Sequence, residues 1–199
     1  MTASAPESSP SVDPAYLALV QEAERLRGEL EEMRQRLAEA ERTADRDTLT
    51  PLLNRRAFIR EVQRTIALAR RHKAPASVIY FDLDGFKGVN DRFGHAAGDA
   101  ALIAVAERLL AEVRESDVVG RLGGDEFAVL LLHADREAAI GKAKGLEAAV
   151  SGAPVEFEGT SFPIGATWGV REIQGADTAE QALAEADAVM YLRKPPKSR

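Results

Sequence analysis

The segment Val118–Leu132, VVGRLGGDEFAVLLL, decides how the rest of the chain is interpreted. Two apolar runs flank the tetrapeptide Gly-Gly-Asp-Glu, and this pattern predicts a β-hairpin with an exposed acidic turn. Gly123 and Gly124 lack a Cβ atom, so they tolerate positive φ angles and let another group approach the backbone closely. Asp125 and Glu126 follow directly. Adjacent residues of a strand point to opposite faces, so at most one of these carboxylates faces a given ligand unless the turn twists them together.

The residue types of this turn suit a hard cation next to a phosphate. Oxygen ligands hold Mg²⁺, and substrate phosphates can complete its octahedral shell. The same residues also suit an ordinary solvated turn, because Gly and Asp are common in turns. The rest of the chain has to distinguish the two interpretations.

Composition argues against several classes of protein. The chain has 199 residues, 45% hydrophobic and 29% charged, which suits one globular domain with an appendage. The net charge of −6 argues against a nucleic-acid partner. No apolar run approaches the roughly 18 residues of a membrane span, so no membrane insertion is expected. Met1–Pro14 does not have the pattern of a signal peptide and is expected to be disordered. The chain has no cysteine, which excludes disulfides and thiolate sites, and we expect a cytoplasmic protein.

Residues 15–46 carry a heptad repeat, which predicts a coiled-coil helix. Positions a and d are apolar or small: Tyr16, Leu19, Ala23, Leu26, Leu30, Met33, Leu37, Ala40 and Ala44. The g-to-e′ pairs of a parallel dimer are all opposite in sign: Glu22–Arg27, Glu29–Arg34 and Arg36–Glu41. The pattern therefore predicts a parallel, in-register homodimer. The alternative is one amphipathic helix packed on its own domain.

The remainder, residues 47–199, is predicted to be a single catalytic domain. Asp47–Pro51 interrupts the repeat. Thr50 is expected to be the N-cap of a basic helix from Leu52 to about His72, with Pro51 in its first turn. Ser77–Asp84 is predicted to be a buried strand that ends in two carboxylates. Because burying a charge without a partner is costly, we expect these acids to face a cleft.

The segment Gly85–Asp99 is predicted to be a ligand-binding loop between that strand and a helix over Ala100–Val113. Lys87 could bind phosphate. Asp99 could accept hydrogen bonds from the N1–H and exocyclic amine of guanine, and Asn90 could meet the opposite edge of the base. Taken singly, each of these residues is more often a loop-capping residue.

The remaining elements complete a mixed α/β fold. We expect a helix over Asp135–Val150, a strand over Phe162–Val170 and a helix over Ala179–Arg193. The order helix, strand, helix, hairpin, helix, strand, helix predicts one mixed sheet with helices packed against it.

Several motifs in this order resemble the GGDEF domain of bacterial diguanylate cyclases, over about Asp47 to Lys194. The resemblance implies a fold like the nucleotidyl-cyclase and polymerase palm. It also implies condensation of two GTP into cyclic di-GMP with release of two pyrophosphates. The matching motifs are Asp47-Thr-Leu-Thr, Asn54-Arg-Arg, Phe81-Asp-Leu-Asp-Gly-Phe-Lys, Asn90-Asp, Gly94-His, Gly98-Asp and Arg121-Leu-Gly-Gly-Asp-Glu-Phe.

The same resemblance implies roles for individual residues. Asp82, the Leu83 carbonyl and Asp125 would hold Mg²⁺, or alternatively Mn²⁺. Asp125 would also be the general base for the 3′-hydroxyl, Lys87 would stabilise phosphate charge, and Glu126 belongs to the catalytic signature. The implied GTP-binding residues are Phe86, Asn90, His95, Asp99, Gly123, Gly124 and Lys194.

A second site is implied just upstream of the hairpin, by Arg114 and Asp117. This Arg-x-x-Asp pattern resembles the family's inhibitory site, at which the product cyclic di-GMP binds. Arg114 could clamp phosphate and stack on guanine, and Asp117 could accept from the base. The alternative is a helix-terminal arginine with an aspartate in the following turn.

Three stretches depart from the family pattern. Pro51 replaces a usual glycine, and Thr167-Trp168-Gly169-Val170 replaces Ser-Ile-Gly-Val. The chain ends Lys194-Pro-Pro-Lys-Ser-Arg199 where the family has a Gly-Arg-Asn motif and a closing strand. Lys194 keeps one phosphate contact, and Lys197 or Arg199 could substitute for the second. The altered end leaves two alternatives open: an inactive receptor for cyclic di-GMP, and a coiled-coil signalling adaptor.

Overall fold

The structure is a computed structural model that describes residues 14–194, with the side chains of residues 14, 16–18, 20, 37–43 and 72 left out. Backbone contacts divide the chain into two units, one that ends at Ala44 and one that begins at Asp45. The expected disorder of Met1–Pro14 falls outside the described residues, except that Pro14 is already helical. Within the described part, no helix is both long enough and apolar enough to cross a membrane.

The first unit contains one long helix, α1 (Pro14–Ala44). Four apolar side chains of the heptad seam are exposed on it: Leu19, Leu26, Leu30 and Met33. The seam residues Tyr16, Leu37 and Ala40 are among those whose side chains are not described. Short-range ion pairs such as Arg25–Glu22 and Arg36–Glu32 lie along the helix surface. Such pairs add a few tenths of a kcal/mol each to an isolated helix.

The second unit contains a five-stranded sheet in the order β1-β3-β4-β2-β7. Its strands are β1 (Leu53–Asn54), β2 (Ala76–Asp84), β3 (Val118–Arg121), β4 (Glu126–Leu132) and β7 (Gly165–Glu172). β1 pairs with β3 in parallel, and the other pairs are antiparallel. The mixed sheet predicted from the sequence is therefore confirmed.

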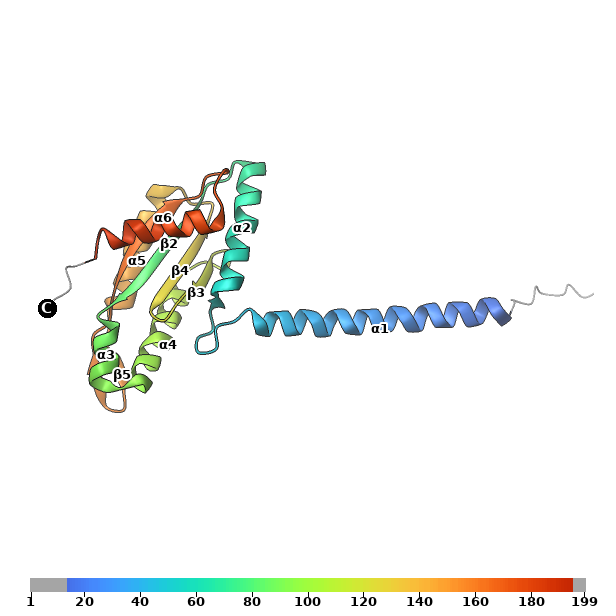
Figure 1. Ribbon diagram of the computed structural model, residues 1–199, viewed down its shortest axis with the longest axis horizontal. Helices are drawn as coiled ribbons and strands as arrows, with labels where there is room; N and C mark the ends of the chain where they lie inside the picture. Colours follow the sequence, from blue (N-terminus) through green and yellow to red (C-terminus); the bar gives the residue numbers. More distant parts are fainter. Residues whose placement is uncertain (1–13, 195–199) are drawn as a thin grey trace, which may run out of the picture. The chain divides into compact units, whose positions relative to one another are not determined.

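Helices cover both faces of this sheet (Figure 1). Their bounds are α2 (Arg55–His72), α3 (Phe86–Phe93), α4 (His95–Glu112), α5 (Arg136–Ser151) and α6 (Ala179–Tyr191). Side chains of β2 alternate between the two faces, as the period of a strand requires. Tyr80 belongs to the core under α2 and α6, and Phe81 to the core under α4 and α5.

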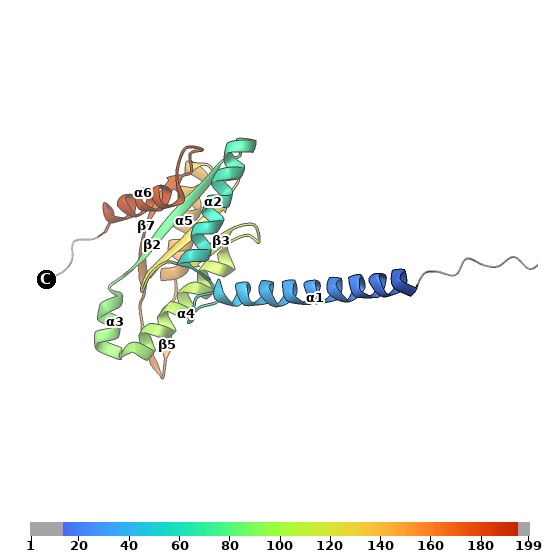
Figure 2. The same cartoon turned by 45° about the vertical axis from the view of Figure 1, so that its right-hand side comes forward.

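A small hairpin was not anticipated from the sequence. It consists of β5 (Val155–Phe157) and β6 (Thr160–Phe162), joined by Glu158 and Gly159, both with positive φ angles. It lies at the same end of the unit as α3 in both views (Figures 1 and 2). Phe162 stacks on Phe93 of α3, with ring centroids 5.0 Å apart.

The predicted strand over Phe162–Val170 is wrong at its start. Phe162 ends β6 and pairs with Val155, whereas β7 begins at Gly165. Pro163 lies between the two strands and has no backbone N–H to give to a ladder, so it suits the break.

The predicted start of the basic helix is also wrong. Thr50 is not its N-cap: the helix begins at Arg55, and the Asn54 side chain accepts from the Ala57 N–H at 3.0 Å. Leu53 and Asn54 pair instead with Gly120 and Arg121 of β3. Pairing with β3 therefore places Leu53 and Asn54 in the sheet, whereas the Thr50-Pro51 pattern predicted that they belong to the first turn of the helix.

The predicted ligand loop Gly85–Asp99 is mostly helical. α3 starts directly after Gly85, and α4 starts at His95 after Gly94; both glycines have positive φ angles. The segment is rich in polar residues and glycine, but Val89, Ala97 and Gly98 are buried where the helices pack. Tertiary burial therefore stabilises helices that local sequence propensity does not favour.

Candidate active site

The acidic turn closes the β3–β4 hairpin, as predicted. Arg121 pairs with Phe127, and the N–H groups of Leu122 and Gly123 donate to the Glu126 carbonyl at 2.8 and 3.4 Å. A Cβ atom at Gly123 would lie 2.2 Å from Oε2 of Glu126. Gly123 is therefore needed for the Glu126 side chain to fold back over the turn.

The two acids of the turn have different surroundings. Glu126 pairs in register with Asp82 of the neighbouring strand β2 and is close to Tyr80. Burial, followed by the negative charge of Glu126, raises the pKa of the Tyr80 hydroxyl. The carbonyl of Asp125 accepts from the Leu83 N–H at 3.1 Å, which joins the turn to the end of β2.

Asp82 and Asp125 form the acidic centre of the site. Burial and the nearby charge of Asp82 both raise the pKa of the Asp125 carboxyl. Oδ1 of Asp82 is buried and has no hydrogen-bond donor of good geometry in the described region, but it lies 2.6 Å from Nζ of Lys194. A cation thus already lies beside this carboxylate. Burial lowers the pKa of Lys194, but its contact with Asp82 outweighs this and the net shift is upward.

The donor atoms of this centre fit a magnesium ion. Residues 14–194 contain no cluster of three or more His, Cys, Asp or Glu arranged to hold a metal. Mg²⁺ does not need such a cage, because it usually binds one or two carboxylates together with water and substrate phosphates. The carboxylates of Asp82 and Asp125 and the Leu83 carbonyl are hard oxygen donors, and Oδ1 of Asp82 is a buried oxygen that already has a cation, Lys194, beside it.

Asp84 has a different partner, although it shares a strand face with Asp82. Oγ1 of Thr167, on β7, donates to Oδ1 of Asp84 at 2.8 Å. Thr167 is buried, so this hydrogen bond joins the neighbouring strands β2 and β7 at the edge of the site.

Besides the two turn glycines and Lys194, the residues expected to bind the nucleotide lie on α3 and α4. Lys87 is exposed on α3, and His95 and Asp99 are exposed in the first part of α4. Asn90 of α3 lies against the backbone of α4, because a Cβ atom at Gly98 would be 2.0 Å from its Oδ1 atom and 3.3 Å from Phe86. The two helices thus bring Phe86 and Asn90 next to the residue that precedes Asp99.

Arg114 and Asp117 line a separate pocket of about 160 Å³. Leu131, Leu132, His133, Ala134, Ala138 and Lys142 complete its lining. Oδ2 of Asp117 accepts from the Arg114 N–H at 3.1 Å, and its Oδ1 accepts from the Leu132 N–H at 3.4 Å. Asp117 thus makes the contacts of an ordinary turn aspartate, which was the alternative to a binding site. It also borders a cavity beside Arg114.

The sequence profile of the diguanylate cyclase GGDEF domain matches residues 44–199. The chain belongs to this GGDEF family. The diguanylate cyclase TpbB of Pseudomonas aeruginosa is 38% identical over 182 residues, which make up 90% of this chain and 41% of TpbB. The chain therefore spans less than half the length of that GGDEF relative.

Solved GGDEF structures have the same fold. The coiled coil and GGDEF domain of DgcB from Caulobacter crescentus, in complex with cyclic di-GMP, superposes with a TM-score of 0.76 at 26% identity, covering 87% of this chain and 93% of that one. The diguanylate cyclase SiaD of Pseudomonas aeruginosa, solved with its activator SiaC, gives a TM-score of 0.75 at 29% identity, covering 89% of this chain and 68% of that one.

Sequence reasoning gave no role to two residues that the structure joins to the GGDEF turn. Arg121 donates to the Gly124 carbonyl and to the carboxylate of Asp47. Both residues stand in motifs that were recognised, but they are 74 positions apart. No local pattern could therefore have paired them.

Proposed function

We propose that this GGDEF protein is a diguanylate cyclase that condenses two GTP molecules into cyclic di-GMP and releases two pyrophosphates. The observation that carries the proposal is the acidic centre of Asp82 and Asp125, in which a buried carboxylate oxygen of Asp82 lies 2.6 Å from Nζ of Lys194. The family match and the diguanylate cyclase relatives support the same activity.

Asp82, the Leu83 carbonyl and Asp125 would hold Mg²⁺, with Mn²⁺ as an alternative. The ion would supply positive charge that stabilises the phosphates during the reaction. Lys194 lies beside Asp82. We propose that Lys194 exchanges this contact for the triphosphate, and that Lys87 adds a second cation to the phosphates.

The proposed role of Asp125 is that of general base. Its carboxylate takes the proton of a 3′-hydroxyl, whose oxygen forms a bond to the α-phosphorus of the other GTP. The bond from that phosphorus to the β-phosphate bridging oxygen breaks, and pyrophosphate carries away the electron pair. Glu126, the other carboxylate of the catalytic signature, pairs in register with Asp82 and is close to Tyr80. We propose that Glu126 supports the shape of the turn, in which Gly123 and Gly124 leave room for the phosphates.

Recognition of guanine is proposed for α3 and α4. Asp99 would accept from the N1–H and the exocyclic amine, and Asn90 would meet the opposite edge of the base. Phe86 and His95 would help to place the nucleotide. Adenine lacks the pair of donors that Asp99 needs, so the proposed substrate is GTP.

The reaction needs two domains that face each other, each with one GTP, so we propose a homodimer. The heptad seam on α1, with its exposed leucines and Met33, supports a parallel coiled coil as the dimerisation element over residues 15–46. Residues 47–199 would form the catalytic domain. Tethering the two domains would raise their effective concentration to about the millimolar range.

Product inhibition is proposed for the pocket beside Arg114 and Asp117. Replacing Arg114 by alanine should raise the inhibitory concentration of cyclic di-GMP about tenfold or more, because a charged hydrogen bond to phosphate is lost. Arg64→Ala, on the exposed face of α2, is the control. Equal inhibition of both variants would refute this site.

The activity is tested by incubating the protein with GTP and Mg²⁺ and resolving the products by chromatography. We expect cyclic di-GMP from the wild type and none from Asp125→Asn, which keeps the size of the side chain but removes the charge. Glu180→Gln, an exposed carboxylate in the first turn of α6, is the control and should remain active. Bound GTP without turnover in the wild type would refute the cyclase and favour the receptor for cyclic di-GMP. Absence of nucleotide binding would favour a signalling adaptor.

A further inference from the structure

We infer that Asp47 and Arg121 are positioning residues, which together hold the peptide unit before Asp125 in the geometry that catalysis requires. The inference rests on the proposed cyclase activity and adds to it two residues outside the metal- and nucleotide-binding sets. Neither residue contacts the reacting atoms in this assignment. They act through the backbone of Gly124.

The planar guanidinium of Arg121 connects the Gly124 carbonyl to the Asp47 carboxylate. Nε and Nη2 donate to the Gly124 carbonyl at 3.3 and 2.8 Å, and Nη1 donates to Oδ1 of Asp47 at 3.0 Å. The Gly124 carbonyl belongs to the same peptide unit as the N–H of Asp125. The guanidinium therefore limits how far this peptide unit can rotate.

Asp47 is in turn fixed by its own segment. Its Oδ1 atom accepts from the backbone N–H and the hydroxyl of Thr50 at 2.9 and 2.8 Å. Thr50 is buried, and the side chains of Asp47 and Arg121 are only 17% and 14% exposed. An ion pair that is shielded from water is stronger and more rigid than one on the surface.

The turn needs such a restraint because its own residues supply little. Gly123 and Gly124 have more conformational freedom to lose than any other residue type. Displacement of a catalytic group by about 1 Å can cost about a hundredfold in rate. Contacts from outside the turn are therefore needed to restrict the position of the Asp125 carboxylate, which follows two glycines.

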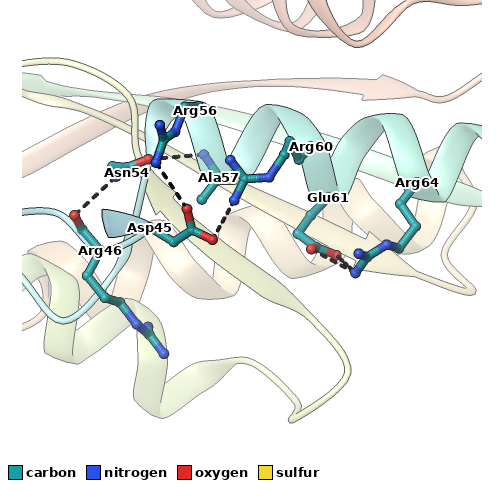
Figure 3. A network of polar contacts seen from close by, with 8 residues as sticks. All are labelled: Asp45, Arg46, Asn54, Arg56, Ala57, Arg60, Glu61 and Arg64. Carbon is teal, nitrogen blue, oxygen red and sulfur yellow. Dashed lines mark hydrogen bonds and ion pairs between the residues drawn. The ribbon is translucent and has the colours of Figure 1, made fainter. Parts of the chain in front are cut away.

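Asp45 provides a matched control only two residues away. Its carboxylate pairs with Arg56 at 3.4 Å and with Arg60, both on α2, as Figure 3 shows. These contacts join it to the helix and not to the catalytic turn. Asp45 and Asp47 thus carry the same charge in the same segment but have different partners.

The test compares Asp47→Asn with Asp45→Asn in the full chain. An asparagine at position 47 can still accept from Thr50, so the local turn is kept and only the charge facing Arg121 is lost. We expect the kcat of Asp47→Asn to fall about tenfold or more while its KM for GTP changes less than about threefold. Asp45→Asn should keep both constants within about twofold. Arg121→Lys should behave like Asp47→Asn, because one ammonium group cannot reproduce the planar fork.

Amide hydrogen exchange of residues 121–127, in the protein without nucleotide, provides a readout that does not depend on activity. Exchange should be faster in Asp47→Asn than in the wild type, and unchanged in Asp45→Asn. Equal exchange and equal kcat in the two variants would overturn the inference. If the wild type makes no cyclic di-GMP, the proposed function fails, and hydrogen exchange alone then decides whether Asp47 orders the turn.

Discussion

Position 98 has a glycine because of the residue that packs against it. A Cβ atom there would lie 2.0 Å from Oδ1 and 3.0 Å from Cγ of Asn90. Gly88, on α3, has nothing within 4 Å of the same hypothetical atom. Gly98 therefore lets α3 and α4 approach closely enough to place Asn90 beside the start of α4.

Gly98→Ala should weaken GTP binding, because the added methyl group displaces the Asn90 side chain. The lost hydrogen bond to the base is expected to raise the KM for GTP by about tenfold, or about 1.4 kcal/mol. Gly88→Ala should leave the KM unchanged. Steady-state kinetics of the two variants tests this, and equal KM values would contradict the proposed role of Asn90.

Asp47 should make stability depend on pH. Burial raises the pKa of its carboxyl, but the hydrogen bonds from Thr50 and then from Arg121 lower it further, so the net pKa is below the ordinary 3.8. The folded protein then holds fewer protons than the unfolded chain. The stabilisation is complete above about pH 4 and is lost as the pH falls through the lowered pKa.

The measurement is the free energy of urea unfolding for the wild type and Asp47→Asn. The difference between them should be largest near pH 7 and should shrink towards about pH 3. A difference that does not change with pH would mean that the carboxylate has the same pKa in the folded and unfolded chains.

Among the elements, α6 and β7 pack unusually closely. A Cβ atom at Gly169 would lie 2.1 Å from the carbonyl oxygen of Ala186 and 2.3 Å from the backbone nitrogen of Met190. Both clashes are with helix backbone, which cannot rotate away as a side chain can. The glycine therefore sets the distance between the helix that leads to Lys194 and the sheet.

Gly169→Ala should destabilise the protein by about 2–4 kcal/mol, because α6 has to move off β7. Gly145→Ala is the contrasting change, since position 145 is on α5 and has open space around it. That variant should be more stable by about 0.5–1 kcal/mol, because alanine favours a helix over glycine. Thermal unfolding of both variants distinguishes them, and similar melting temperatures would show that α6 adjusts freely.

The end of α6 is also held by the tryptophan that departs from the family pattern. The guanidinium of Arg193 lies over the Trp168 ring, 3.9 Å from its centroid. The indole N–H donates to Oε2 of Glu147 at 2.8 Å. Trp168 thus joins α5 to the residue that precedes Lys194, which gives this substitution a structural reason.

At the scale of the whole molecule, the proposed dimer depends on the apolar a and d positions of the heptad repeat on α1. Leu30 is an exposed a position, and Gln35 is an f position on the opposite face of the same helix. Leu30→Asp would place charges at the centre of a coiled coil, whereas Gln35→Asp would place them in water.

We expect Leu30→Asp to be monomeric and Gln35→Asp to be dimeric in sedimentation experiments. At micromolar protein, the activity of Leu30→Asp should be at least about tenfold lower, because the two domains then meet only by diffusion. Equal mass and equal activity of the two variants would contradict a coiled-coil dimer and leave α1 as a monomeric helix.

Local patterns were sufficient for much of the fold and for the chemistry of the turn. Two apolar runs on either side of Gly-Gly-Asp-Glu indicated the hairpin, and the apolar run that ends in Asp82 and Asp84 indicated β2. The pairing of Asp82 with Lys194 and the separate surroundings of Asp125 and Glu126 appeared only in the structure. Local sequence specifies which face of a strand a residue occupies, but not what packs opposite it.

The sequence by itself determined the order of the longer helices and strands, the acidic turn and the heptad seam, because each depends on neighbours a few residues away. Only the tertiary structure decided that Gly85–Asp99 forms helices, that Leu53 and Asn54 join the sheet, and that Asp47 meets Arg121. In each of these cases the free energy comes from contacts between distant segments. Burial and pairing across the fold then outweigh the local preference of the residues.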